Sequence, residues 1–229
     1  MKIIIIDEVD STNEYLKKNY QKMEEHTCLQ AICQTGGRGR RGHIWNSQQG
    51  NLTVSFLYRD ILHIQEAWKY TMIAAGSVID MLGHYGIDAS VKWPNDVYVG
   101  DDKICGILAE TIFDPELKGI IVGIGVNVND ASPYISMKAI KNQNYDVHEV
   151  MTCLAMMMEK HITLYQQGEF KKILDNLNHN SYLLGKWIQY QNHGVITFLR
   201  INEQGMAEYM DQNGKTGVML VNEISLSVL

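Results

Sequence analysis

The segment KWPNDVYVGDDKICGIL, residues 92–108, gives the clearest indication of the fold. Two short apolar runs, Val97–Val99 and Ile104–Ala109, are separated by a glycine and two acidic residues, which is typical of a β-hairpin. Pro94 keeps Trp93 out of the helical region, because the proline ring clashes with a helical backbone at the preceding residue. The segment therefore predicts a fixed bend followed by a hairpin.

Lys103 follows Asp96 by seven residues and falls on the opposite strand of this hairpin. In antiparallel pairing the lysine lies close to the carboxylate, which keeps its ammonium charged and in place. The hairpin could place Lys103 in a functional site. It could equally be a plain turn followed by a surface lysine, because an isolated lysine more often lies on the surface.

The flanking sequence predicts a mixed sheet with helices. Strands are expected at Leu29–Gln34, Leu52–Tyr58 and Gly119–Val128. Helices are expected at Glu66–Leu82 (ending at Gly83), Val147–Tyr165 and Phe170–Leu177. Near the N-terminus, the run Ile3–Ile6 predicts a strand buried on both faces. Ser11 and Glu14 form a capping-box pattern, which predicts a helix that runs to about Lys18 or Tyr20.

From about Ser181 the pattern changes to short strands separated by turn residues. These turns are Asn192–Gly194, Asn202–Gly205 and Asn213–Gly214. The fold class is therefore predicted as α+β, with a mixed sheet and flanking helices in residues 1–180 and a small all-β domain in residues 181–229.

Composition limits the function classes. The 229 residues are 45% hydrophobic with a net charge of −6, which excludes a disordered chain and argues against a general polyanion binder. The four cysteines form no CxxC pair and the eight histidines no HExxH motif, so a reducing compartment is expected and a zinc site is not. The N-terminal apolar run is too short for a signal or a membrane span, which indicates a cytoplasmic protein.

The loop GRGRRG, Gly37–Gly42, matches G-x-G-x-x-G in letters only. No helix opens after it, and three arginines stand where a dinucleotide fold has small residues. Guanidinium groups on a glycine-rich backbone suit phosphate and carboxylate oxygens, so the loop is a candidate anion site. Taken alone, it could equally be a solvated basic loop or a weak RNA contact.

These motifs together resemble the catalytic domain of biotin–protein ligases. The matching pieces are DSTN at Asp10–Asn13, QTGGRGRRG at Gln34–Gly42, Trp45, KWPNDVYVGDDKICGIL at Lys92–Leu108 and GIGVNVN at Gly123–Asn129. They occur in the family's order and span most of the first predicted domain. The two glycines of the last piece suit the close approach of a ligand or a neighbouring backbone. The C-terminal segment resembles the family's small SH3-like β-barrel less specifically.

The resemblance implies a catalytic domain of the class II aminoacyl-tRNA-synthetase and biotin–lipoate ligase type. It implies that ATP, with Mg²⁺ not fixed by the protein, activates biotin as biotinyl-5′-AMP, and that biotin then passes to a lysine of a biotin carboxyl carrier protein. The catalytic residues would be Lys103 and Arg40. Biotin would contact Ser11, Thr12, Asn13, Gln34, Arg38, Gly39, Arg40 and Lys103. The adenylate or ATP would contact Arg38, Arg40, Arg41, Trp45, Asn95, Lys103 and Asn127.

The residues agree with this chemistry. Adenylation brings a carboxylate and a phosphate together, so it needs cations rather than a protein nucleophile, and no Ser-His or Cys-His motif is present.

The sequence departs from the family pattern in two places. His43 stands where family loops usually have an arginine, and the tail stretch Gly217–Leu220 lacks the aromatic residue that stacks on adenine in some members. Adenine is therefore expected to rely on aliphatic packing. Because DSTN begins at residue 10, no N-terminal helix-turn-helix domain and no sequence-specific DNA binding are expected.

Two alternatives remain. A lipoate–protein ligase or octanoyltransferase shares the fold, although those families use different glycine-rich signatures. A non-catalytic biotin sensor would keep the pocket without turnover, although the retained Lys103 disfavours it. An exposed sheet edge could pair two copies into a homodimer, and the sequence decides neither this nor the identity of the carrier.

Overall fold

The computed structural model describes residues 1–47, 49–59, 63–130, 134–190, 194–219 and 226–228. Seven strands form the main sheet in the order β1-β2-β3-β7-β6-β5-β4. Their bounds are Lys2–Val9 (β1), His26–Gln34 (β2), Leu52–Tyr58 (β3), Ser90–Lys92 (β4), Asp96–Val99 (β5), Asp102–Phe113 (β6) and Leu117–Val126 (β7). Only β1 and β2 pair in parallel; the other neighbours are antiparallel.

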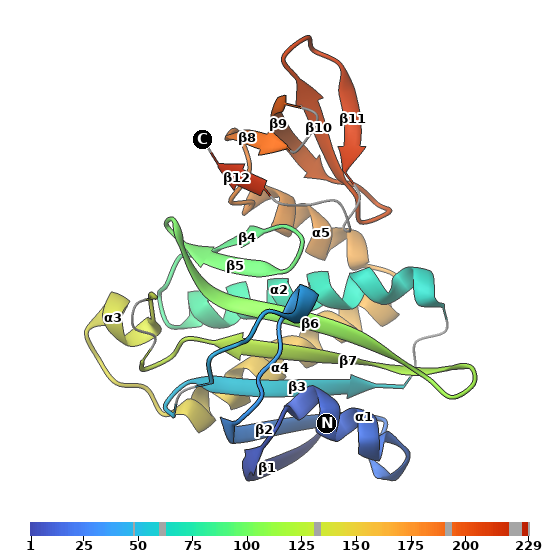
Figure 1. Cartoon of the computed structure of the whole chain (residues 1–229), viewed down its shortest axis with the longest axis vertical. Coiled ribbons are helices and arrows are strands. Elements are labelled where there is room, and N and C mark those ends of the chain that lie inside the picture. The colour runs from blue at the N-terminus through green and yellow to red at the C-terminus, as the bar shows by residue number, and fades with distance from the viewer. Residues whose placement is uncertain (48, 60–62, 131–133, 191–193, 220–225, 229) are drawn as a thin grey trace.

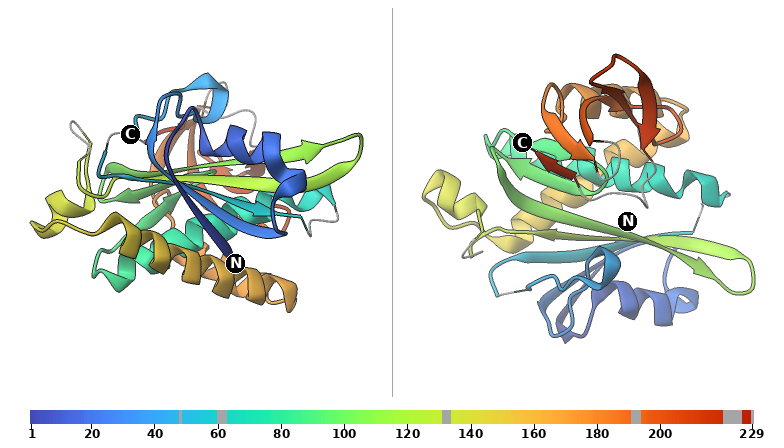
Figure 2. Two further views of the ribbon diagram at one scale, coloured as in Figure 1. Left: turned by 90° about the horizontal axis from the view of Figure 1, so that it is seen from below. Right: turned by 45° about the horizontal axis from the view of Figure 1, so that its top comes forward.

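Helices cover the two faces of this sheet unequally. They are α1 (Thr12–Asn19), α2 (Ala67–His84), α3 (Met137–Lys141), α4 (Val147–Gln166) and α5 (Phe170–His179). The long helices α2 and α4 pack on one face, while α1 packs on the other over β2, β3 and β7 (Figure 1 and Figure 2, left). The face that carries α1 is therefore left largely open. None of the helices in the described ranges is long and apolar enough to cross a membrane.

A second, antiparallel sheet follows α5 in the order β11-β10-β9-β8-β12. Its strands are Trp187–Tyr190 (β8), Gly194–Ile201 (β9), Ala207–Asp211 (β10), Thr216–Met219 (β11) and Leu226–Val228 (β12). The expected small β-domain is therefore present, and Figure 1 shows it beyond the β4 edge of the main sheet. The expected turn at Asn192 and His193, and Leu220 of the tail, lie outside the described residues. We propose a boundary between the two units at residue 180.

The expected strands and long helices are confirmed, with small shifts at their ends. Helix α2 passes Gly83 and ends at His84, and the left-handed residue that follows it is Gly86, with φ 68°. The expected burial of Ile3–Ile6 on both faces is wrong, because β1 is the edge strand and leaves Ile3 40% and Ile5 46% exposed.

The expected capping box is also wrong. Ser11 does precede α1, but its side chain accepts no hydrogen bond from the helix. Glu14 instead forms an ion pair with Arg38, at 3.1 Å. The helix starts where expected, without the reciprocal pair of cap hydrogen bonds.

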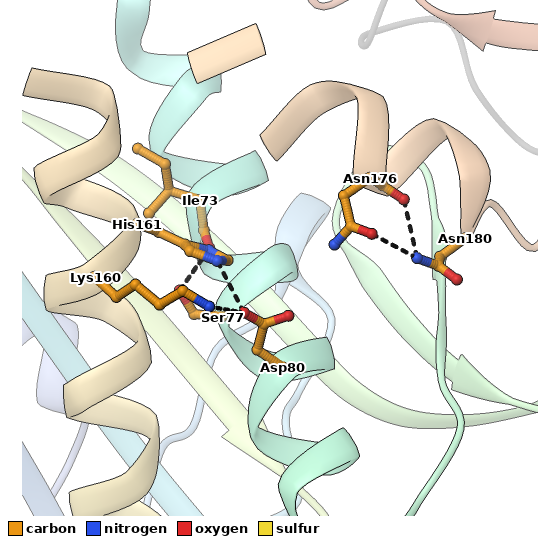
Figure 3. A network of polar contacts seen from close by, with 7 residues as sticks. All are labelled: Ile73, Ser77, Asp80, Lys160, His161, Asn176 and Asn180. Carbon is orange, nitrogen blue, oxygen red and sulfur yellow. Dashed lines mark hydrogen bonds and ion pairs between the residues drawn. The ribbon is translucent and has the colours of Figure 1, made fainter. Parts of the chain in front are cut away.

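A polar network joins α2 to α4 within the core (Figure 3). His161 is buried, and its Nε2 lies 3.1 Å from Asp80 Oδ2, while Lys160 Nζ lies 2.9 Å from the same oxygen. Behind the ring, Ser77 Oγ lies 3.2 Å from His161 Nδ1 and donates to the carbonyl of Ile73. The network links the two helices because Asp80 of α2 contacts both Lys160 and His161 of α4. Figure 3 also shows Asn180, which caps the end of α5 through Asn176.

The two sheets meet at a turn of the second one. Gly205, between β9 and β10, accepts a 3.2 Å hydrogen bond on its carbonyl from the buried indole of Trp93. A Cβ atom on Gly205 would lie 2.4 Å from the ring of Trp68. The turn therefore fits between two tryptophans of the main unit only as glycine.

We expect Asp80→Asn to reduce stability at neutral pH and to flatten its acid dependence. The hydrogen bond from His161, with help from Lys160, lowers the pKa of Asp80 to about 2, so this contribution is present above pH ~4 and is lost as the pH falls towards 2. The expected loss at pH 7 is about 1–2 kcal/mol, since the carboxylate is partly exposed. Chemical denaturation from pH 7 to pH 2 measures this, with Asp175→Asn, from the exposed Lys171–Asp175 pair, as the control. Equal losses in both variants would contradict it.

We expect Gly205→Ala to lower the melting temperature more than Gly214→Ala. Both glycines have φ 79°, so both variants carry the same backbone strain of about 1 kcal/mol. Only Gly205 would also clash with Trp68, whereas nothing lies within 4 Å of a Cβ on Gly214. Thermal unfolding of the two variants side by side isolates the contact between this turn and Trp68 of α2. Matched melting temperatures would show that the turn does not need glycine for packing.

Candidate active site

A cavity of about 330 Å³ opens on the face of the main sheet that carries α1. Its walls come from the start of α1, the loop of residues 34–45, the turn of residues 92–96, and strands β3, β6 and β7. The floor is the sheet, and the loop crosses above it. The site therefore gathers segments that are far apart in the sequence.

One end of the cavity is polar and uncharged. Gln34 Oε1 accepts from the backbone N–H of Thr12 at 2.8 Å and from its hydroxyl at 3.0 Å. Asn13 donates to Glu110 at 2.8 Å and to the carbonyl of Leu108 at 3.3 Å. These side chains are held in fixed directions before any ligand arrives, so this end can offer a set of donors and acceptors to a neutral polar group.

The buried Ser55 orients this end from behind. Its hydroxyl lies 2.6 Å from both Thr12 Oγ1 and Asn13 Oδ1. Ser55 was not among the site residues predicted from the sequence. A signal was available, because Thr53 and Ser55 alternate as polar residues on one face of an otherwise apolar strand.

The loop above the floor is shaped by its own backbone. Arg38 and Ile44 form an isolated bridge, and the N–H of Gly39 donates to the carbonyl of His43 at 2.7 Å. Arg41 lies at the tip with φ 55°, in the left-handed region. This small hairpin directs Arg38, Arg40 and Arg41 to the rim of the cavity.

Trp45 returns the loop to the floor of the cavity. A Cβ atom on Gly125 would lie 2.2 Å from its indole, and one on Gly106 would lie 2.9 Å from it. The two glycines therefore leave the space that the ring fills. The indole Nε1 is buried and has no hydrogen-bond partner among the described residues, so a bound acceptor would offset a cost of roughly 1–3 kcal/mol.

The other end of the cavity is cationic. Lys103 Nζ lies 2.7 Å from Asp96 Oδ1, which confirms the expected proximity across the β5–β6 hairpin. Arg40 donates to Asn95 Oδ1 at 2.9 Å. Burial lowers the pKa of the Arg40 guanidinium from its usual value, and the nearby charge of Arg41 lowers it further. An anion in the cavity would relieve this cost.

The expected site residues come together with one exception. Those that line the cavity are Ser11, Thr12, Asn13, Gln34, Arg38, Gly39, Arg40, Arg41, Trp45, Asn95 and Lys103. Asn127 does not line it; its side chain donates to the carbonyls of Lys103 at 3.4 Å and Ile135 at 3.0 Å. It thus lies behind Lys103 and fixes that strand's backbone.

The cavity offers little to a metal ion. Asp96 is the one carboxylate among its described lining residues, and it already faces Lys103. Elsewhere in the described ranges, no group of three or more His, Cys, Asp and Glu side chains is arranged to hold a metal. The tail residues Gly217–Met219 also do not reach the cavity lining.

Comparison with known proteins places this site in a family. Residues 5–127 match the model of the "Biotin/lipoate A/B protein ligase family". The chain is similar to the bifunctional ligase/repressor BirA of Bacillus spizizenii, with 30% identity over 79% of this chain and 58% of that protein. It is similar to the biotin–[acetyl-CoA-carboxylase] ligase of Paracoccus denitrificans, with 31% identity over 64% of this chain and 67% of that protein.

A solved structure resembles the whole chain. The biotin protein ligase from Aquifex aeolicus in complex with biotin and ATP is 30% identical, covers 100% of this chain and 99% of its own, and superposes with a TM-score of 0.86. The chain spans a smaller part of several curated relatives: 58% of the Bacillus spizizenii protein and 51% of biotin–protein ligase 1 of Arabidopsis thaliana.

We expect Gly125→Ala to push the Trp45 indole out of its place on the floor. The emission of this tryptophan should shift to longer wavelength and become easier to quench, because the added methyl would overlap the ring. Subtracting the spectrum of a matching Trp45→Phe variant removes the emission of the other three tryptophans and leaves that of Trp45. Gly83→Ala is the control, since nothing lies within 4 Å of a Cβ there. An unchanged Trp45 signal would mean that the ring does not rest on Gly125.

Proposed function

The chain belongs to the biotin/lipoate A/B protein ligase family, and we propose that it is an ATP-dependent biotin–protein ligase. It forms biotinyl-5′-AMP from biotin and ATP and then transfers biotin to a lysine of a carrier domain. The observation that carries this proposal is one cavity with a neutral polar end at Thr12 and a cationic end at Lys103. Biotin has the matching polarity, with a neutral ureido ring at one end and a carboxylate at the other.

The polar end suits the ureido ring. Ser11, Thr12, Asn13 and Gln34 offer hydroxyl and amide groups that can both donate and accept. Because Ser55 and Gln34 restrain Thr12, little side-chain entropy is lost on binding.

The cationic end suits adenylation. A carboxylate oxygen of biotin attacks the α-phosphorus of ATP, the bond from that phosphorus to the bridging oxygen breaks, and pyrophosphate leaves with the electron pair. Lys103 and Arg40 reduce the repulsion between the two anions and stabilise the charge that builds up in the transition state. The ion pair with Asp96 keeps the Lys103 ammonium in place for this step.

The transfer of biotin to the carrier lysine needs protection of the adenylate from water rather than a further catalytic group. The amine of the carrier lysine attacks the acyl carbon, AMP leaves, and the nitrogen loses a proton. The Gly37–Trp45 loop lies above the cavity and excludes water from the mixed anhydride until then.

We assign the nucleotide to the outer part of the cavity, against Arg38, Arg40, Arg41, Trp45 and Asn95. Asn127 supports Lys103 from behind in this assignment. Adenine relies on apolar packing in this assignment, since Gly217–Met219, the described part of the tail stretch, do not line the cavity. Asp96 is the one carboxylate among the described lining residues, so the protein itself would hold Mg²⁺ weakly. Mg²⁺ supplied with ATP would neutralise part of the phosphate charge.

The proposed partners follow from the reaction. The acceptor is a biotin carboxyl carrier domain of a biotin-dependent enzyme, in the cytoplasm. No DNA partner is proposed for a chain with a net charge of −6. A homodimer through an exposed sheet edge stays a prediction, and β1 and β4 are the two edges of the main sheet. Lipoate transfer and a non-catalytic sensor remain the two alternatives.

We expect Lys103→Met to reduce biotinyl-adenylate formation by roughly 100-fold or more, because a cation that acts on the transition state is removed. Pyrophosphate release in the presence of biotin measures this step, and Lys118→Met, from an exposed pair with Glu116, is the control. The same assay with a carrier domain compares biotin with lipoate. Transfer of lipoate only would favour the lipoate ligase, and biotin binding without pyrophosphate release would favour the sensor.

A further inference from the structure

Lys92, the first residue of the KWPND segment, lines the cavity but has no part in the mechanism above. Its ammonium lies 4.8 Å from the ring centre of Tyr98 and 5.4 Å from that of Tyr182. It also donates to the Tyr98 hydroxyl at 3.3 Å. Two aromatic rings therefore hold a cation at the wall of the site, on the side of the segment that leads to the second sheet.

Its neighbours are paired with carboxylates, and Lys92 is not. Lys103 lies 2.7 Å from Asp96, and Lys186 lies 3.2 Å from Asp101. Among the described residues, no carboxylate oxygen lies within 4.0 Å of Lys92 Nζ. Asp96 is its register partner across β4 and β5, yet that carboxylate is turned to Lys103.

The surroundings of Lys92 favour the arrival of an anion. Burial lowers the pKa of Lys92 from its usual value, although the charge of Asp96 opposes this. Burial also raises the pKa of Tyr98 to about 12, so this hydroxyl stays a neutral phenol at physiological pH. A charged lysine has three N–H donors, and Tyr98 takes one of them. The remaining donors suit an acceptor that carries negative charge.

We propose that Lys92 binds the pyrophosphate end of ATP and stabilises pyrophosphate as it leaves. This rests on the proposed function, in which Lys103 faces the carboxylate and the α-phosphate. Asp96 is the register partner of Lys92 on β4 and the ion-pair partner of Lys103 on β6, and both lysines line the cavity. In this proposal the phosphate chain extends from Lys103 towards Lys92. When the bond between the α-phosphorus and the bridging oxygen breaks, the new negative charge falls on the β-phosphate, which Lys92 faces.

Lys92 therefore acts in the first half of the reaction only. After pyrophosphate has left, the transfer of biotin from the adenylate to a carrier lysine creates no charge at this place. A purely structural role of Lys92 would affect both halves. Measuring the two half-reactions separately therefore distinguishes pyrophosphate binding by Lys92 from a purely structural role.

The test compares Lys92→Met with Lys186→Met. Both remove an ammonium that contacts Tyr182, but Lys186 does not line the cavity. Calorimetry with the magnesium salt of inorganic pyrophosphate, on the biotin-loaded protein, measures binding without turnover. Lys92→Met is expected to weaken pyrophosphate binding roughly 10- to 100-fold, the range for a hydrogen bond to a charged group, and Lys186→Met less than about threefold.

Transfer from preformed biotinyl-adenylate to a carrier domain is expected to stay within about twofold of the unmodified protein in both variants. The inference would be overturned if Lys92→Met left pyrophosphate affinity unchanged, or if Lys186→Met reduced that affinity as much as Lys92→Met does. It would also be overturned if Lys92→Met reduced biotin transfer as much as it reduces pyrophosphate affinity. Failure of the proposed function is distinguishable, because the unmodified protein would then bind pyrophosphate through Lys92 yet form no adenylate from biotin and ATP.

Discussion

The ion pair between Lys103 and Asp96 is the interaction on which the site depends. It spans the β5–β6 hairpin with a separation of 2.7 Å, and both residues line the cavity. Asn95, next to Asp96, binds Arg40 of the loop above. One short hairpin therefore sets the position of a lysine and an arginine that come from different parts of the chain, which is what a reaction between two anions requires.

The second constraint is space on the sheet. Gly106, Gly123 and Gly125 stand on neighbouring strands, and side chains from α1 and the loop fill the volume that they leave. Asn13 rests against Gly123, and Trp45 rests against Gly125. Because α2 and α4 cover the opposite face, this face remains free for a ligand, and the second sheet fixes the nearby Trp93 through Gly205.

Most strands and helices, and many residues that line the cavity, could be predicted from the sequence, because turn residues and hydrophobic periodicity are local features. The hairpin around Gly100 placed Lys103 beside Asp96 without any tertiary information. The burial of Ile3–Ile6 was predicted wrongly, because the sequence of one strand does not reveal its position in the sheet. The structure places β1 at the edge. Ser55 was missed because it acts through Thr12 from a neighbouring strand. The placement of Asn127 behind Lys103 depends likewise on long-range register.

A crystal structure with biotin and a non-hydrolysable ATP analogue would show most directly whether Lys103 binds both reacting anions. We expect the ureido ring beside Thr12 and Gln34, and the biotin carboxylate within ~3 Å of Lys103 Nζ, a hydrogen-bond distance. The α-phosphate should lie at the same lysine. Biotin bound in the reverse direction, or a carboxylate with no contact to Lys103, would contradict it.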